Sequence, residues 1–327
     1  MRLDQPQLVE LAASTGFRKE TLEKVDRLVG LLEDVNRHPL LSRVLALKGG
    51  TALNLGFGPP SRLSVDLDFN YIGAAEREAM LAQRPDVERA LESIARAQGY
   101  TVQRSKDEHA WHKYFMEYSS AFGARDRVEA DLNFLHRVPI GPPVRLGIWR
   151  PDGETGFSVQ AVGLEELSAG KMCALLDRVL PRDCFDVIRL PGIIGERWDG
   201  RLRLLFIALA GALDRPLQDY GEERLERVTQ AAVAEQLHPS AAAELVGTGT
   251  GVFGKNPIWG ASARAPLPRG GEACRPPEKQ PGPPLEGRKC AEAGQETQVT
   301  RSPPSRRSLP RRVVRPHSTL YQIEIPA

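Results

Sequence analysis

The sequence of 327 residues predicts an α/β (α+β) fold, in which a core of strands and helices is followed by a helical domain and a disordered tail. Apolar and polar residues alternate over 65–70 and 128–134, as they do in half-buried strands. Apolar residues recur at helical spacing near the N-terminus and again from residue 164. The composition then changes abruptly after Val246. We therefore predict three parts: a core (1–160), a helical domain (161–246) and a tail (247–327).

The totals describe a chain with enough apolar residues for a core and no membrane-spanning segment. Hydrophobic residues make up 41% of it. The longest apolar run, residues 204–213, is about half of what a bilayer span needs, so it predicts a buried helix. Residues 1–15 are polar where a signal peptide would be apolar. The four cysteines show no CxxC spacing, which argues against a zinc site and a disulfide framework. We expect a cytoplasmic protein that makes no membrane contact.

The first elements are a helix, a short strand and a second helix. Apolar residues of the first helix recur at helical spacing (Leu22, Val25, Leu28 and Leu32). Residues 43–48 are typical of a buried strand that the following glycines end. The second helix is expected to begin at Thr51, whose hydroxyl is suited to cap it. Residues 58–62 then form a turn.

The next strand carries two carboxylates on one face. In "SVDLDFNY", residues 64–71, apolar side chains alternate with Asp66, Asp68 and Asn70. Side chains two residues apart on a strand point the same way, so the two aspartates lie together. Such a pair can share a divalent cation with a phosphate. The alternative for an isolated pair is a solvated edge strand.

A second strand repeats this arrangement further along the chain. A helix over residues 75–98, interrupted near Pro85, and two strands over 100–105 and 111–120 come first. The segment "RVEADLNFLHRVPI" then places Asp131 on the polar face of another strand. Asp131 is therefore a candidate third carboxylate, and an ordinary exposed aspartate is the alternative.

A glycine pair precedes the first carboxylate strand. Gly49 and Gly50 allow backbone N–H groups to approach an anion, and the start of the following helix favours negative charge. Alone, the pair also suits a simple strand-to-helix turn. Arg62 and Ser64 stand between the glycines and the aspartates. Arg62 either contacts phosphate or pairs with a carboxylate.

The helical segment holds a second group of charged residues. Lys171 and Arg178 are seven residues apart and so share one helix face. Pro181 ends that helix, and Asp183 and Asp186 then share one face of the next. A cationic pair beside an acidic metal site can bind a triphosphate and neutralise charge in the transition state. The alternative is a surface network that joins two helices.

The tail differs from the rest of the chain in charge and composition. Residues 247–327 carry 13 Lys or Arg against 6 Asp or Glu, a net charge of +7, whereas the remainder carries 31 against 36, a net charge of −5. The tail also holds 13 of the 26 prolines. This composition predicts disorder. We hypothesise that the tail is a frameshifted translation, and the alternative is a basic arm that contacts RNA.

Four segments in order resemble the motifs of AbiEii/AbiGii-type nucleotidyltransferase toxins, over roughly residues 20–215. They are "LKGGTALNLGFGPPSRLSVDLDFNY", "WHKYFMEYSS", "VEADLNFLHRVPI" and "EELSAGKMCALLDRVLPRDCFDV". The resemblance implies a polymerase-β-like nucleotidyltransferase core with a mixed sheet, followed by a helical domain. It implies an NTP substrate, a Mg²⁺ cofactor, a cognate antitoxin and a role in type IV toxin–antitoxin or phage-defence systems. Some relatives add nucleotides to tRNA 3′ ends.

The resemblance assigns roles by motif. Asp66, Asp68, Lys171 and Asp183 match its catalytic residues, and the two aspartates, with Asp131 less firmly, match its metal ligands. Its nucleotide-binding residues match Gly49, Gly50, Thr51, Arg62, Ser64 and Arg178. Lys113 is a weaker match in a looser motif. Family members continue with ordered helices where this chain switches to "GTGTGVFGKNPIWG", a departure that concerns both stability and RNA docking.

The leading hypothesis is therefore a Mg²⁺-dependent toxin that transfers NMP from an NTP to an RNA acceptor, tRNA-like or other. Asp183 is expected either to orient Lys171 or to assist deprotonation of the attacking group. A protein acceptor is also open. The alternatives are an inactive remnant that binds nucleotide or antitoxin, and a metal-dependent phosphohydrolase. The histidines form no catalytic triad, and we expect His109 and His112 near a substrate surface.

Overall fold

A computed structural model describes residues 2–58, 60–106, 110–153, 157–195 and 199–237. The chain divides into two units, 1–260 and 261–327, and all described residues belong to the first. The predictions of a disordered, frameshifted or RNA-binding tail concern residues outside these ranges, as does the one on His109.

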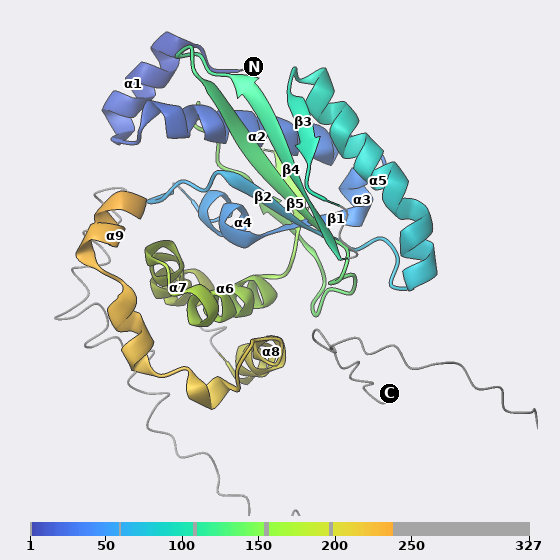
Figure 1. The fold of residues 1–327 in the computed structure, drawn as a ribbon, viewed down its shortest axis with the longest axis vertical. Coiled ribbons are helices and arrows are strands. Elements are labelled where there is room, and N and C mark those ends of the chain that lie inside the picture. Colours follow the sequence, from blue (N-terminus) through green and yellow to red (C-terminus); the bar gives the residue numbers. More distant parts are fainter. Residues whose placement is uncertain (1, 59, 107–109, 154–156, 196–198, 238–327) are drawn as a thin grey trace, which may run out of the picture. The chain divides into compact units, whose positions relative to one another are not determined.

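The described strands form one mixed sheet, which confirms the predicted α/β fold class (Figure 1). Pairs β2–β5 and β1–β7 are parallel and the others are antiparallel. Strands β6 and β7 were not predicted. In spatial order the strands are β3 (Thr101–Arg104), β4 (Trp111–Ser119), β5 (Arg125–Asn133), β2 (Asp66–Tyr71), β1 (Leu45–Lys48), β7 (Ser158–Ala161) and β6 (Val144–Gly147).

The register of the sheet aligns four charged residues. Asp68 of β2 stands opposite Lys48 of β1 and opposite Asp131 of β5. Lys113 of β4 stands opposite Asp131 on the other side. The row across β1, β2, β5 and β4 is therefore cation, anion, anion, cation. The two carboxylates are neighbours because β2 and β5 are paired in this register.

Helices α2 (Lys19–Arg37) and α5 (Arg77–Ala97) pack on the apolar face of the sheet (Figure 1). The side chains of β4 with even numbers lie on this face and are buried. His112 is one of them: it is 2% exposed and its Nδ1 lies 2.8 Å from Glu88 Oε1. The expectation that His112 lies near a substrate surface is therefore wrong, because its strand position directs it toward the helices.

Two predictions about the early helices are also wrong in detail. The second helix, α4 (Gly49–Gly56), begins two residues before Thr51. Thr51 does not cap it, because its hydroxyl donates to the Asp66 carbonyl instead. Helix α5 continues through Pro85 without interruption, since buried Met80 and Val87 hold it on both sides of the proline.

Two further helices were not predicted from the sequence. One is α1 (Gln5–Thr15), where Asp4 and Gln7 form a reciprocal capping box. The other is α3 (Leu41–Val44), a single turn before β1.

The described part beyond the sheet is helical, as predicted. It comprises α6 (Leu164–Arg178), α7 (Pro181–Ile194), α8 (Gly200–Ala210), 3₁₀ turns (Leu217–Asp219 and Glu222–Arg227) and α9 (Gln230–Gln236). Pro181 starts α7, so the predicted break is confirmed. The predicted boundary between residues 160 and 161 stays a prediction.

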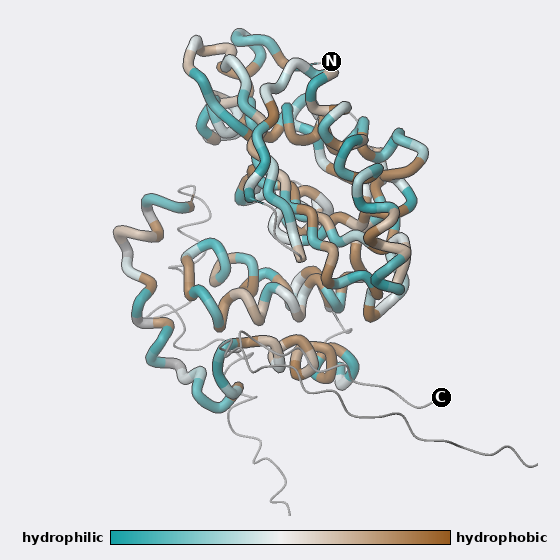
Figure 2. Tube along the Cα trace, turned by 45° about the vertical axis from the view of Figure 1, so that its right-hand side comes forward, coloured by the Kyte–Doolittle hydropathy of each residue, from teal (hydrophilic) through white to brown (hydrophobic). Residues whose placement is uncertain are grey.

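Helix α8 is apolar over much of its length (Figure 2). The prediction of a buried helix holds for one face only, because Leu204 and Ile207 are 69% and 48% exposed. Only one face of α8, with Leu202 and Leu205, packs against its neighbours. No helix in the described ranges is both long enough and apolar enough to cross a bilayer.

Candidate active site

A cavity of about 390 Å³ lies between the polar face of the sheet and helices α6 and α7. Its volume suits a small-molecule ligand such as a nucleotide. All the predicted site residues except Thr51 line it: Gly49, Gly50, Arg62, Ser64, Asp66, Asp68, Asp131, Lys171, Arg178 and Asp183. The structure thus brings together residues that are up to 134 positions apart in the sequence, from Gly49 to Asp183.

The carboxylates line one wall of the cavity. Asp131 Oδ2 lies 3.3 Å from Lys113 Nζ, which is also 3.2 Å from Glu129 Oε2. Asp131 Oδ1 is buried and accepts no hydrogen bond from any described residue. Lys113 therefore holds one oxygen of Asp131, and the other oxygen has no hydrogen-bond partner in the described ranges.

The surroundings of these carboxylates concentrate negative charge. Burial, followed by the nearby Asp68 and Glu129, raises the pKa of Asp66. Burial also raises the pKa of Asp131, and Asp68 adds to this while Lys113 opposes it. Carboxylates that are partly desolvated and close together favour a cation between them.

The oxygen atoms that line the cavity suit a magnesium ion that takes only a few of its ligands from the protein. In the described part of the chain, no three His, Cys, Asp or Glu side chains are arranged to hold a metal ion by themselves. Mg²⁺ typically takes one or two carboxylates and completes its shell with water and substrate phosphate. Asp66 and Asp68, with the unpaired oxygen of Asp131, match that pattern.

Neighbouring side chains pack so closely against Gly49 and Gly50 that neither position has room for a Cβ atom. Gly49 has φ +74°, and a Cβ there would overlap the Asp68 carboxylate and lie 2.8 Å from its Cγ. A Cβ on Gly50 would lie 2.7 Å from Ser64 Oγ and 3.3 Å from Arg62 Nη2. The pair therefore lets the start of α4 lie directly against the carboxylates and the residues before them.

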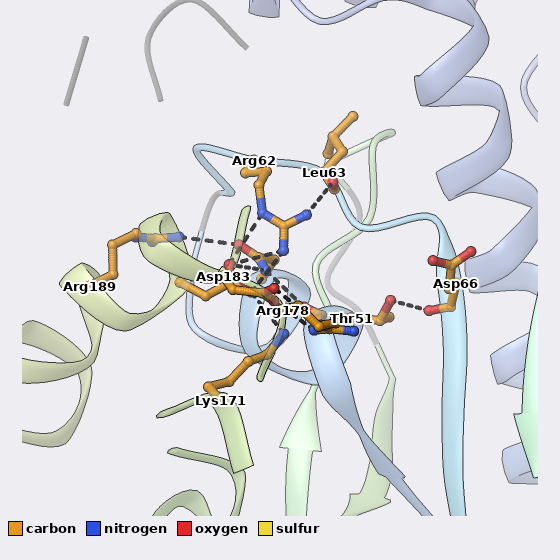
Figure 3. A network of polar contacts seen from close by, with 11 residues as sticks. Thr51, Arg62, Leu63, Asp66, Lys171, Arg178, Asp183 and Arg189 are labelled. Atoms are coloured by element: carbon orange, nitrogen blue, oxygen red, sulfur yellow. Dashed lines mark hydrogen bonds and ion pairs between the residues drawn. The ribbon is translucent and has the colours of Figure 1, made fainter. Parts of the chain in front are cut away.

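A buried ion network joins α7 to α6, to α4 and to the turn before β2 (Figure 3). Asp186 accepts two short bonds from Arg62 Nη2, each 2.9 Å, and lies 2.8 Å from Lys171 Nζ. Asn54 Nδ2 donates to the same carboxylate at 3.1 Å. Burial alone raises the pKa of Asp186, but Arg62 and Lys171 outweigh it and hold the pKa below its usual range.

The two aspartates of α7 have different partners. Asp183 is 1% exposed and accepts from Arg178 Nη2 at 2.7 Å and from Nε at 3.2 Å. Lys171 pairs with Asp186 rather than with Asp183, so Asp186 is the residue that orients Lys171. Of the two readings of Arg62, the carboxylate pair is the one observed.

The side chain of Thr51 makes a structural contact, and the predicted contact of this residue with a nucleotide stays a prediction. It is fully buried, and its hydroxyl donates to the Asp66 carbonyl. This bond joins the first turn of α4 to the beginning of β2. The residue therefore holds the glycine turn and the carboxylate strand in place.

Five further polar or charged residues line the cavity and were not assigned from the sequence. They are Lys48, Asn70, His136, Glu166 and Arg182. A signal existed for two of them: Lys48 directly precedes the glycines, and Asn70 continues the polar face of the carboxylate strand. Nothing in the sequence indicated His136 or Glu166, because they enter the cavity from a loop and from the first turn of α6.

Comparisons with solved structures show nucleotidyltransferases of low identity. MenT4, a nucleotidyltransferase toxin from Mycobacterium tuberculosis H37Rv, is 16% identical, with 78% of this chain and 92% of that chain covered and a TM-score of 0.46. ANT(2″)-Ia in complex with adenylyl-2″-tobramycin is 15% identical, with 57% and 97% covered and a TM-score of 0.38. CdnE cyclic dinucleotide synthase from Elizabethkingia meningoseptica is 14% identical, with 71% and 84% covered and a TM-score of 0.25.

A search of curated proteins finds no match to the sequence. The model of one family, described as nucleotidyl transferase AbiEii toxin of type IV toxin–antitoxin systems, matches residues 30–246. This match covers most of the chain and includes every residue that lines the cavity. The chain belongs to the AbiEii nucleotidyltransferase toxin family.

Proposed function

We propose that this toxin transfers NMP from an NTP to the 3′-hydroxyl of an RNA acceptor, tRNA-like in form, with Mg²⁺ as its cofactor. Family membership implies an NTP substrate and an antitoxin partner, and nucleotidyltransferases of this kind typically use a divalent metal. The observation that supports the proposal is one cavity that joins paired carboxylates, a glycine turn at a helix start and buried cations. These are the parts that phosphoryl transfer needs.

In the proposed reaction the acceptor hydroxyl attacks the α-phosphorus. The hydroxyl gives up its proton to water, and the new P–O bond forms as the bond from the α-phosphorus to the oxygen that bridges to the β-phosphate breaks. Pyrophosphate leaves with that oxygen and its charge. Asp66 and Asp68, with Asp131, would hold Mg²⁺, which supplies charge neutralisation to the attacking and leaving oxygens. The remaining residues bind and orient the triphosphate.

The triphosphate is proposed to lie against the start of α4. Gly49, Gly50 and Thr51 offer backbone N–H groups there, and the helix N-terminus favours an anion. The Ser64 hydroxyl lies beside Gly50 and is proposed to donate to the same phosphate. This proposal assigns Thr51 a main-chain role, since its side chain is engaged with Asp66.

Three cations are proposed to neutralise the leaving pyrophosphate. Arg62 and Lys171 are fixed by Asp186, and each keeps further N–H groups for phosphate. The side chain of Arg178 is 44% exposed and is oriented by Asp183. Asp183 thus acts through Arg178, which favours a positioning role over deprotonation of the attacking group.

Transfer of label from each of four α-labelled NTPs, with Mg²⁺, into cellular RNA and protein tests the proposal. We expect label in a discrete RNA band, and none with the Asp66→Ala variant, whose fold is checked by circular dichroism. Label confined to protein would indicate a protein acceptor. Phosphate release without any labelled polymer would indicate a phosphohydrolase. Nucleotide binding without either product would indicate an inactive remnant.

A further inference from the structure

The polar face of the sheet continues beyond the cavity along β4 and β5. Lys113 of β4 lines the cavity, whereas Trp111 and Phe115 are not among the described residues that line it. Side chains two residues apart on a strand point the same way, so both aromatic rings share the face of Lys113, about 7 Å to either side along the strand. The burial pattern agrees, because all three are partly exposed while the residues between them are buried.

The register of the sheet relates these two aromatic residues to the carboxylate strand. Phe115 ends the row that contains Asp66, and Trp111 ends the row that contains Asn70. The row that ends at Lys113 lies between them. The aromatic rings therefore flank the row of charged residues that leads from β4 to the candidate metal ligands.

Neither of the two aromatic side chains belongs to the apolar core. The described residues that form the core or pack against it include Tyr71, Tyr114 and Phe134, but neither Trp111 nor Phe115. Helices α2 and α5 pack on the opposite side of the sheet. Isolated apolar residues on a surface need no explanation, whereas grouped ones mark sites of interaction. Two rings on one strand face, with a cation between them, form such a group.

Two arginines of β5 add positive charge to this face. The guanidinium carbon of Arg127 lies 4.8 Å from the centre of the Phe115 ring, and its Nε lies 2.9 Å from Glu129 Oε1. Arg125 is exposed, and no ion pair joins it to another described residue. The carboxylates of β4 and β5 on this face have donors beside them: Glu117, Glu129 and Asp131. We call the side of β4 and β5 that carries Trp111, Phe115, Arg125 and Arg127 the aromatic face.

The aromatic face lies on the side from which the acceptor has to approach. In phosphoryl transfer the attacking and leaving oxygens lie roughly in line, on opposite sides of the phosphorus. The leaving pyrophosphate is proposed to lie against Gly49 and Gly50, which directly follow β1. In the sheet, β5 and β4 lie on the other side of β2 from β1. An acceptor hydroxyl that attacks in line therefore comes from the side of β5 and β4.

We propose that the aromatic face binds the single-stranded 3′ end of the RNA acceptor, with bases stacked on Trp111 and Phe115 and phosphates beside Arg125 and Arg127. Proteins recognise unstacked RNA bases by stacking them on aromatic rings and on guanidinium planes. This inference rests on the proposed function, which supplies the acceptor. A protein partner would also contact aromatic rings, and the experiment separates the two.

The first measurement is the Kd of the full-length protein for a fluorescein-labelled single-stranded RNA of about twelve nucleotides, by fluorescence anisotropy. We expect Trp111→Leu and Phe115→Leu each to weaken binding about ten-fold, because each removes one stacking ring. Trp111→Phe keeps a ring and should retain most of the affinity. Abasic sites at the 3′ end should weaken binding to wild type but not to the double leucine variant, whereas a merely structural role would leave that difference in place.

A matched control uses an aromatic ring outside the sheet. Tyr220 is partly exposed, and the guanidinium carbon of Arg224 lies 4.6 Å from its ring centre. Tyr220→Leu should leave the Kd unchanged. Photo-crosslinking of wild-type protein to RNA that contains 4-thiouridine needs no variant, so it stands even if a leucine variant does not fold. The crosslinked peptides should come from β4 or β5, and crosslinks confined to other segments would overturn the inference.

Transfer assays separate this inference from the proposed function. We expect the double leucine variant to raise KM for the RNA by about ten-fold or more and to bind a non-hydrolysable NTP with Mg²⁺ as wild type does. An unchanged KM for RNA would overturn the inference and leave the proposed function intact. RNA binding that depends on the two rings, without any transfer, would overturn the proposed function alone. If the double variant bound RNA normally but lost transfer of label to protein, the face would bind a protein and the inference would be wrong.

Discussion

Asp186 shows how one buried residue organises the cationic side of the cavity. It accepts from Arg62, Lys171 and Asn54, which come from a turn and two helices. These contacts fix two cations that the proposed function assigns to phosphate binding. The carboxylate therefore stabilises the fold and orients the site through the same bonds.

Replacement of Asp186 by alanine would leave Arg62 and Lys171 buried without their counter-charge. We expect the free energy of unfolding, measured with urea, to fall by about 3–5 kcal/mol. Asp126→Ala, which removes the partly exposed pair with Lys24, is the control and should cost less than about 1 kcal/mol. If both variants lost a similar amount of unfolding free energy, burial would not explain the contribution of the Asp186 ion pairs.

The pH dependence of this contribution follows from the lowered pKa of Asp186. Arg62 and Lys171 outweigh burial and hold the folded-state pKa below the usual value of 3.8. Stability from this carboxylate is therefore present above pH 3.8 and lost as the pH falls through the folded-state pKa. The difference in unfolding free energy between wild type and Asp186→Asn should stay constant from about pH 5 to 8. If this difference became smaller as the pH fell from about 8 to 5, the lowered pKa of Asp186 would be refuted.

Gly49 combines backbone strain with close approach, and the two effects can be separated. Gly49→Ala places a Cβ on the Asp68 carboxylate at φ +74°. We expect it to cost about 3 kcal/mol or more and to abolish transfer. Gly123→Ala meets the same kind of strain at φ +84° with nothing within 4 Å, so it should cost about 1–2 kcal/mol. Chemical denaturation of both variants measures the difference.

At the scale of elements, the pairing of β2 with β5 decides the position of the carboxylates. Asp68 and Asp131 are direct neighbours in this parallel register. A slip of one residue would turn Asp131 to the helix-covered face, because side chains alternate along a strand. The apolar residues of β5, Val128, Ala130 and Leu132, are buried and thereby fix the register.

Helix α5 tolerates a proline that contributes nothing to its own hydrogen bonding. Pro85 is exposed and lies inside the helix, where it lacks an N–H donor. We expect Pro85→Ala to raise the free energy of unfolding by about 1–2 kcal/mol, since an interior proline disfavours a helix and its loss also frees the unfolded chain. Transfer activity should be unchanged. A lower Tm for Pro85→Ala than for wild type would show that packing of the proline ring stabilises the fold.

At the scale of the whole molecule, ligand binding should stabilise the fold through both walls of the cavity. With Mg²⁺ and a non-hydrolysable NTP at about one hundred times its Kd, stability rises by about 2.7 kcal/mol. That corresponds to a Tm increase of roughly 5–10 °C for a chain of this size. The Asp66→Asn, Asp68→Asn double variant should lose most of the shift. An equal shift in wild type and double variant would show that these aspartates do not hold the metal.

The fold class and about half of the residues that line the cavity can be predicted from the sequence. The evidence came from local patterns, which can be recognised without a structure. They are the period-two alternation, the glycine pair and the K…R…RDxxD spacing. The same patterns placed Asp66, Asp68 and Asp131 on matching strand faces. They also indicated the AbiEii nucleotidyltransferase toxin family. The match of the family model to residues 30–246 shows this membership.

Only the tertiary structure decided which charged groups pair and which further residues line the cavity. Asp183 and Asp186 are one turn apart on α7, and the packing of α6 and α4 assigns Arg178 to the first and Lys171 with Arg62 to the second. His112 is directed toward the helices by strand parity. Lys48, His136 and Glu166 interact electrostatically at the cavity and come from β1, a loop and α6. Such contacts join residues far apart in sequence, and no local pattern encodes them.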